Sequence, residues 1–185
     1  RSQRFWRKAW PVFWKRVQYV NPGKRLVLKS PAHAARIVEI LSLYPDAKCI
    51  HMVPDPYRVF MSREKSSRAM IATQSLQDKM PSLEAARMGG IELFNSVHET
   101  YSRDVGLIPE GNLVTLRYED LRADPKGEIR LIYDQLDLGD FTQVAPHLAQ
   151  FMSAKKGYVN NSYDMPSEIE ALVYEHWRPY FEAYG

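Results

Sequence analysis

Apolar residues follow two different spacings along the chain, and together they predict helices that alternate with short strands. Residues 4–20 show the spacing of a helix with one apolar side, although Pro11 lies inside the pattern and should kink or interrupt it. Three short apolar runs predict buried strands instead, at residues 25–29, 48–53 and 112–118.

The segments that follow these runs predict further helices. Ser30 is placed to cap the first of them, with Pro31 at its first helical position. Its buried side would carry Ala34, Ile37, Val38 and Leu41. The other helical patterns cover residues 57–70, 82–104 with a weak point at Gly89-Gly90, 125–136, 141–153, and the segment from 166 onward. Strands separated by helices indicate an α/β fold, with a mainly parallel sheet flanked by helices in one domain, 1–185.

Charge is distributed unevenly along the chain. Residues 1–38 contain ten Lys or Arg and no Asp or Glu, whereas the remainder has 15 Lys or Arg against 22 Asp or Glu. This basic segment indicates that the N-terminal part faces an anion, although solvated charges, or pairs with the acidic remainder, explain most of it equally well. A nucleic-acid-binding module ranks last, because no known nucleic-acid motif is present.

Composition narrows the class of protein. The hydrophobic share of 45% and the charged share of 25% are those of a globular domain, and no apolar run approaches the roughly 18 residues of a membrane span. The single cysteine, Cys49, excludes an internal disulfide and a multi-cysteine metal site, and it fits a reducing compartment. We therefore expect a cytoplasmic protein. Because the chain begins at Arg1, directly in an amphipathic pattern, we also expect that a longer protein has lost its beginning.

Residues that directly follow the predicted strands are the first candidates for chemistry, because parallel sheets bind ligands at the carboxyl ends of their strands. Lys29 ends the first strand and could stabilise negative charge on a phosphate or sulfate oxygen. His33, one helical turn further on, could act as a general base toward a hydroxyl. Taken alone, however, this segment favours a lysine in water and a surface histidine.

The two other strand ends offer weaker signals. Asp55 and Pro56 are explained by the start of a helix, in which Ser62 lies one to two turns further on. Tyr118 ends the third strand, where its ring could lie against an adenine.

A late loop adds two positive charges. Lys155, Lys156 and Gly157 form a basic segment that could close over an anionic ligand, or could equally be a solvated loop.

Three segments taken together resemble a known family. They are "KRLVLKSPAHAARIVEILSLYPDAKCIHMVPDPYRVFMS", "IPEGNLVTLRYEDLRADPKGEIRLIYDQLDL" and "KKGYVNN". The chain resembles, in order over residues 5–185, the bacterial sulfotransferases that use 3′-phosphoadenosine 5′-phosphosulfate (PAPS). The combination of the three is far more specific than any one segment.

The resemblance implies a fold like that of the P-loop kinases and a reaction without a required metal, in which a sulfuryl group moves from PAPS to an acceptor hydroxyl or amine. It implies that Lys29 lies near the bridging or sulfuryl oxygens and that His33 is the nearest candidate for a general base. The residues implied to contact the nucleotide are Ser62 at the 3′-phosphate, Tyr118 beside the adenine, and Lys155, Lys156 and Gly157 in the closing loop.

Two departures from the family pattern keep an alternative open. The family usually begins with a strand and a Gly/Ser/Thr-rich loop that binds the 5′-phosphosulfate, and no such segment occurs in this sequence. We therefore expect an N-terminally incomplete fold. Its sheet would have open strand edges, which favour a homo-oligomer. Pro54 stands where the family has an arginine eight residues before the serine, and Arg58 or Arg63 could compensate. The alternative is a non-catalytic scaffold that binds an anionic glycan or nucleotide.

Overall fold

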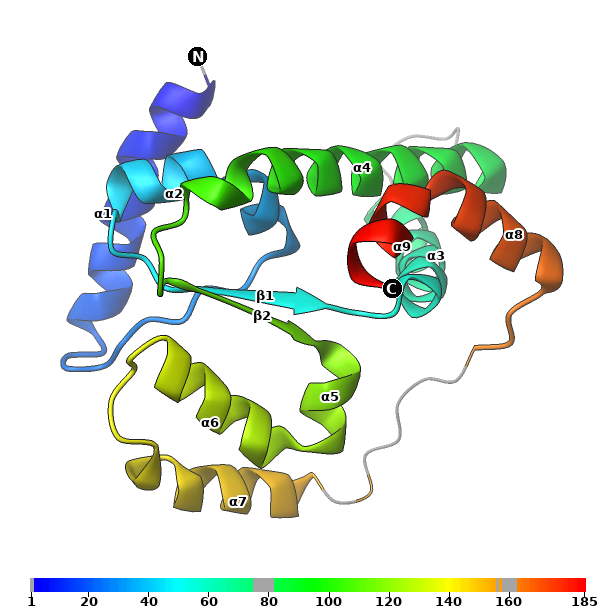
Figure 1. Ribbon diagram of the computed structural model, residues 1–185. Helices are drawn as coiled ribbons and strands as arrows, with labels where there is room; N and C mark the ends of the chain where they lie inside the picture. Colours follow the sequence, from blue (N-terminus) through cyan, green and yellow to red (C-terminus); the bar gives the residue numbers. More distant parts are fainter. Residues whose placement is uncertain (1, 75–81, 156, 158–162) are drawn as a thin grey trace.

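A small parallel sheet lies at the centre of the computed structural model, which describes residues 2–74, 82–155, 157 and 163–185. Its strands are β1 (Cys49–Val53) and β2 (Leu113–Arg117), paired in parallel so that Cys49 is opposite Leu113 and Val53 is opposite Arg117. Figure 1 shows α4 on one side of the sheet and α6 with α7 on the other. The predicted α/β architecture, with a parallel sheet flanked by helices, is therefore confirmed.

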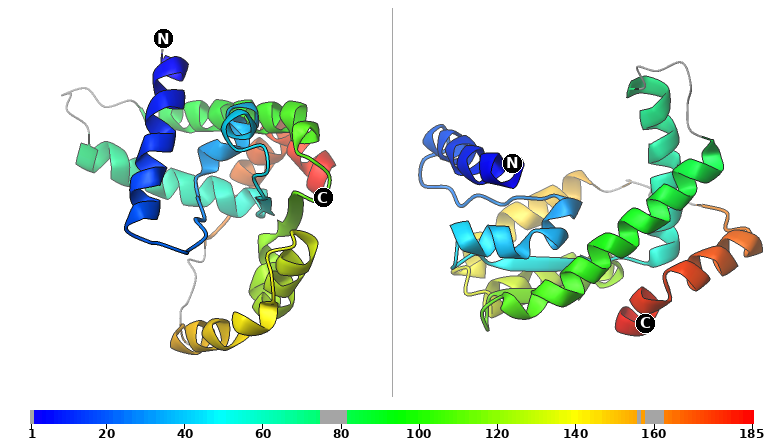
Figure 2. Two further views of the ribbon diagram at one scale, coloured as in Figure 1. Left: turned by 90° about the vertical axis from the view of Figure 1, so that its left-hand side faces the viewer. Right: turned by 90° about the horizontal axis from the view of Figure 1, so that it is seen from above.

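Helices make up most of the remaining described chain. From the N-terminus they are α1 (Ser2–Tyr19), the 3₁₀ helix η1 (Pro31–Ala35), α2 (Ile37–Leu43), α3 (Pro56–Gln74), α4 (Leu83–Asp104), η2 (Val105–Leu107), α5 (Tyr118–Ala123), α6 (Pro125–Gln135), η3 (Phe141–Gln143), α7 (Ala145–Ala154), α8 (Ser167–His176) and α9 (Arg178–Tyr184). Figures 1 and 2 place α1 at one end of the molecule and α8 with α9 at the other.

Side chains alternate between the two faces of the sheet, and each face has its own core. On one face, Val114 and Leu116 of β2 pack with Ile132 of α6 and with Leu136, which directly follows α6. The opposite face carries His51, whose ring stacks on that of Tyr101 of α4 with centroids 4.0 Å apart.

The larger core lies where β1 ends. Its buried members are Val53, Phe60, Ile91, Val173, Trp177 and Tyr180, contributed by β1, α3, α4, α8, α9 and the junction between α8 and α9. This core holds the C-terminal helices against α3 and α4 and so fixes the start of α3, which directly follows β1.

Local sequence signals explain where several helices begin. The Ser82 hydroxyl accepts a hydrogen bond from the backbone N–H of Ala85 at 3.1 Å and caps α4. The Asp124 carboxylate accepts one from the N–H of Gly127 at 2.9 Å and caps α6, which has Pro125 at its first turn. The helix α1 continues through Pro11 from Ser2 to Tyr19.

Two local predictions are wrong. Residues 25–29 form no strand: the segment has no regular secondary structure and pairs with no strand among the described residues, and Val27 is 83% exposed. The Ser30 side chain does not cap the helix that follows. A 3₁₀ helix and a break at Arg36 precede α2, which rotates the helix relative to the predicted pattern. As a result, Ile37 is buried as predicted but Val38 is exposed.

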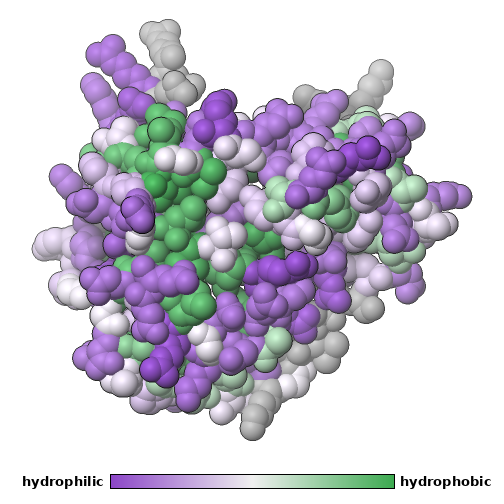
Figure 3. Space-filling model, viewed as in Figure 1, coloured by the Kyte–Doolittle hydropathy of each residue, from purple (hydrophilic) through white to green (hydrophobic). Residues whose placement is uncertain are grey.

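A large exposed apolar surface lies at the α1 end of the molecule. Figure 3 shows green, apolar surface gathered over the region of α1 and α2. The half-buried rings of Trp6 and Trp10 stack with centroids 4.5 Å apart, while Phe5 and Phe13 on the same helix lie more than half exposed. No described helix is long and apolar enough to cross a membrane.

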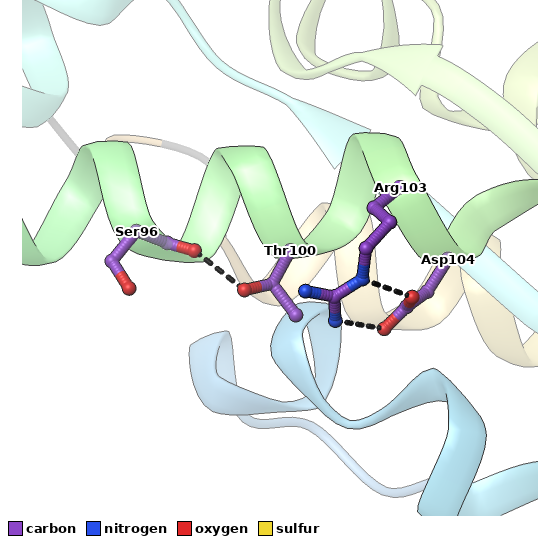
Figure 4. Close-up of polar contacts among 4 residues, drawn as sticks. All are labelled: Ser96, Thr100, Arg103 and Asp104. Carbon is purple, nitrogen blue, oxygen red and sulfur yellow. Dashed lines mark hydrogen bonds and ion pairs between the residues drawn. The ribbon is translucent and has the colours of Figure 1, made fainter.

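The C-terminal end of α4 holds a buried carboxylate. Asp104 is 7% exposed, and Arg103 donates two hydrogen bonds to it, from Nε at 2.7 Å and from Nη2 at 2.8 Å (Figure 4). On the preceding turns, the Thr100 hydroxyl donates to the Ser96 carbonyl at 2.7 Å. The hydrogen bonds from Arg103 lower the pKa of Asp104, so the carboxylate stays charged where it is buried.

Candidate active site

The carboxyl ends of the two strands lie side by side, as predicted. Val53 pairs with Arg117 at the last register position. Just beyond it, the backbone N–H of Asp55 donates a hydrogen bond to Glu119 Oε1 at 3.2 Å. The residues that follow β1 and those that follow β2 therefore meet at one edge of the sheet, which is where ligands bind in parallel α/β folds.

The first turns of α3 carry Ser62 into solvent at this edge. Asp55 Oδ1 accepts a hydrogen bond from the N–H of Arg58 at 2.8 Å, which caps the helix ahead of Pro56. Arg58 and Ser62 are both exposed and four residues apart, so they lie on the same face of α3. A guanidinium and a hydroxyl one turn apart can together bind a phosphate.

Pro54 packs against the C-terminal helix α9. Its carbonyl accepts a hydrogen bond from the Tyr180 hydroxyl at 3.1 Å, and the residue lies half-buried in a small cavity lined also by Phe181 and Tyr184 of α9. This position therefore anchors the C-terminal helix and carries no cation toward the edge of the sheet.

Arg63 cannot take the place of the missing arginine in the way that Arg58 can. Its Nη2 lies 3.5 Å from the point that a Cβ on Gly90 of α4 would occupy, so the side chain points inward between α3 and α4. Burial lowers the pKa of the Arg63 guanidinium. Of the two arginines that the sequence offered, the exposed Arg58 is the one beside Ser62.

Tyr118 begins α5 directly after β2 and is 36% exposed. It is thus available for a planar ligand at the same edge of the sheet. The neighbouring Glu119 is half-buried, and its Oε2 has no hydrogen-bond partner among the described residues.

Lys29 and His33 lie on the connection between α1 and α2. Lys29 is exposed on the irregular segment before η1, whereas His33 is half-buried in η1, with its ring 5.8 Å from that of Trp10. Burial, with a smaller effect of Arg36, lowers the pKa of His33, so the imidazole is neutral near pH 7 and can accept a proton. No hydrogen bond or ring contact in the described part of the chain joins these two residues to Ser62 or Tyr118.

The late basic loop is described only in part. Lys155 is the exposed last residue of the α7 region, with its Nζ 5.9 Å from the centre of the Phe151 ring. Gly157 has a φ of +94°, a conformation that favours glycine. Lys156 lies outside the described residues.

Sequence reasoning missed one feature of this region. A cavity of about 290 Å³ lies between α3 and α4, with Trp177 in its wall. Its position depends on how α3 is rotated against α4, which local patterns do not determine. Among the described residues, no group of three or more His, Cys, Asp or Glu side chains could hold a metal ion.

Comparison with known proteins identifies relatives over the whole chain. The model of the Sulfotransferase family matches residues 4–143. The omega-hydroxy-beta-dihydromenaquinone-9 sulfotransferase Stf3 of Mycobacterium bovis is 32% identical over 185 residues, which are 100% of this chain and 47% of that protein. Carbohydrate sulfotransferase 2 of Homo sapiens is 30% identical over 167 residues, covering 69% of this chain and 29% of that protein. The chain thus spans about half the length of Stf3 and less of the carbohydrate enzyme, and no solved structure matches it.

Proposed function

Because this chain belongs to the sulfotransferase family, we propose that it binds PAPS and moves the sulfuryl group to an acceptor hydroxyl or amine. The observation that carries the proposal is the exposed pair Arg58 and Ser62 on α3, directly after β1, at the edge of the sheet where Tyr118 follows β2. We further propose that residues 1–185 act as one sulfotransferase-like domain, while the cytoplasmic location and the homo-oligomer stay predictions.

The nucleotide would be held by residues from several elements. Ser62 and Arg58 would bind the 3′-phosphate, and the Tyr118 ring would lie against the adenine. Lys155, with Lys156 and Gly157 of the same loop, would cover the nucleotide from the α7 side. The hydrogen bond from Asp55 to Glu119 supports this arrangement, because it holds the starts of α3 and α5 together.

Lys29 and His33 would carry the transfer itself. His33 would accept the proton of the acceptor hydroxyl or amine as its oxygen or nitrogen forms a bond to sulfur. Lys29 would stabilise the negative charge that develops on the bridging oxygen as the bond from that oxygen to sulfur breaks and 3′-phosphoadenosine 5′-phosphate (PAP) leaves. The lowered pKa of His33 supports its role, since only the neutral imidazole can take the proton.

The relatives support an acceptor hydroxyl more than an amine. The name of Stf3 states a hydroxylated menaquinone acceptor, and the name of the other relative states a carbohydrate. We therefore propose an alcohol as the acceptor of this chain.

Titration with PAP tests the nucleotide site apart from the chemistry. Saturable binding in the micromolar range that is weakened about tenfold by Ser62→Ala, as expected for the loss of one hydrogen bond to a charged group, supports the proposal. Absence of PAP binding would instead favour the second candidate, a non-catalytic scaffold, to which the proline at position 54 points.

Turnover tests the catalytic assignment. Lys29→Ala should lower sulfuryl transfer by about 10²-fold or more without changing the PAP affinity to a similar degree. Lys24→Ala is the matched control, because Lys24 is an exposed lysine five residues earlier on the same connection. Equal losses in the two variants would refute the role of Lys29.

A further inference from the structure

The cavity between α3 and α4 lies on the face of α3 opposite Ser62. Its α3 lining repeats at helical spacing, through Phe60, Arg63, Glu64, Ser67, Arg68, Ile71 and Ala72. At about 100° per residue, this face is centred roughly half a turn away from Ser62 and Arg58. The cavity is therefore a separate site from the proposed nucleotide site.

Apolar side chains form much of the wall. Phe60, Ile71 and Leu83 line it, together with Trp177, which is only 1% exposed. The Trp177 ring is fixed by stacking on Phe94, with centroids 3.8 Å apart. A cavity of about 290 Å³ with such a wall has room for a small apolar body.

The charged lining is unbalanced in favour of cations. Three arginines, Arg63, Arg68 and Arg87, face one carboxylate, that of Glu64. Glu64 is already engaged, since its Oε1 lies 2.6 Å from Arg87 and its Oε2 lies 3.8 Å from Arg68. The Glu64 carboxylate is thus already paired with Arg87 and Arg68, and the described lining contains no other carboxylate for Arg63.

Arg63 is a half-buried guanidinium with no acidic partner within the described ranges. The absence of a side chain at Gly90 lets it lie against α4, where burial lowers its pKa and no carboxylate offsets the cost.

This lining fits a ligand that supplies acceptor oxygens and negative charge to Arg63 together with an apolar body. We propose that the cavity between α3 and α4 binds a small amphiphilic anion, a carboxylate or a sulfate monoester on an aliphatic or aromatic body. Arg63 binds the anionic group, and Phe60, Ile71 and Leu83 hold the body. This site is independent of the proposed transfer reaction.

The test uses calorimetric titration of the chain with three probes that each contain eight carbon atoms: octyl sulfate, octanoate and neutral 1-octanol. One anion or both should bind with one-to-one stoichiometry and at least about tenfold more tightly than octanol, because Arg63 forms a charge-assisted hydrogen bond only with the anions. Preference for octyl sulfate assigns a sulfate monoester as the ligand, and preference for octanoate assigns a carboxylate.

Variants locate the binding. Arg63→Gln should weaken the anions about tenfold and leave octanol unchanged, whereas the matched variant Arg58→Gln, on the opposite face of the same helix, should leave all three probes unchanged. Ala86→Leu, in the half-buried wall, should block the cavity to every probe. Ala72→Leu, at the exposed rim, should also block it and leaves the half-buried wall unchanged.

Three results would overturn the proposal. They are equal affinity for octanol and the anions, binding of the anions at several sites that Arg63→Gln does not affect, and full binding in folded Ala86→Leu and Ala72→Leu proteins. Thermal unfolding of each variant establishes that it is folded before it is titrated.

Discussion

The backbone N–H of Asp55 donates a hydrogen bond to the Glu119 carboxylate at 3.2 Å, which joins the first residues after β1 to the first residues after β2. Asp55 in turn caps α3 through its own carboxylate, which accepts from the N–H of Arg58. One side chain from the end of β2 therefore positions the start of the helix that carries Ser62.

Removal of the Glu119 acceptor should destabilise the fold. Glu119→Ala leaves the N–H of Asp55 without its acceptor, and we expect a loss of about 1 kcal/mol in the free energy of unfolding, measured in urea. Glu119→Gln keeps an acceptor oxygen and is the matched control, with a smaller loss. An alanine variant as stable as the parent chain would contradict this role.

The two arginines that flank Ser62 should differ in their effect on PAP. Arg58→Gln should weaken PAP binding by about tenfold or more, because Arg58 is exposed on the face of Ser62 and a guanidinium binds phosphate through charge-assisted hydrogen bonds. Arg63→Gln should leave the PAP affinity unchanged, since that side chain lies against Gly90. Isothermal titration with PAP compares them, and the reverse order of effects would show that α3 presents another face to the nucleotide.

The ion pair between Arg103 and Asp104 should stabilise the fold, and removal of Arg103 alone should destabilise it. Arg103→Met leaves the buried Asp104 carboxylate without its hydrogen-bond donor, so the thermal midpoint should fall by several degrees. The double variant Arg103→Met with Asp104→Leu removes the charge as well and should recover part of the loss. A double variant that is less stable than the single one would contradict this explanation.

The elements that the sequence predicted correctly are those with local causes. The runs at β1 and β2 are apolar and end where a helix begins, and the caps of α4 and α6 come from Ser82 and Asp124. Residues 25–29 show a similar apolar run, but a strand also needs a neighbour to pair with, and no described strand supplies one. Arg25 instead donates a hydrogen bond from its side chain to the carbonyl of Leu138 at 3.3 Å.

The candidate site divides in the same way. Ser62 and Tyr118 could be assigned from the sequence, because each directly follows or lies near the end of a strand that forms. The choice between Arg58 and Arg63 could not, because it depends on the rotation of α3 against α4, which Phe60 and Gly90 determine through tertiary packing.

His51 should make the stability of the chain depend on pH below neutrality. Its ring is half-buried between Tyr101 and Tyr184, and burial, with a smaller effect of His98, lowers its pKa from 6.5 to about 4. Between pH 6.5 and pH 4 the unfolded chain therefore binds a proton that the folded chain does not, so the free energy of unfolding decreases as the pH falls through this range. His33 and His98, whose pKa values are also lowered, act in the same direction.

His51→Phe isolates this contribution, because phenylalanine keeps an aromatic ring against Tyr101 but cannot be protonated. After allowance for partial exposure, the parent chain should lose about 2 kcal/mol more than the variant between pH 7 and pH 4, as measured by urea unfolding at intervals of pH. Carboxylate protonation affects both chains alike and cancels in the comparison. Parallel pH profiles for the two chains would show that His51 has the same proton affinity folded and unfolded, and would rule out burial of its neutral form as a source of stability.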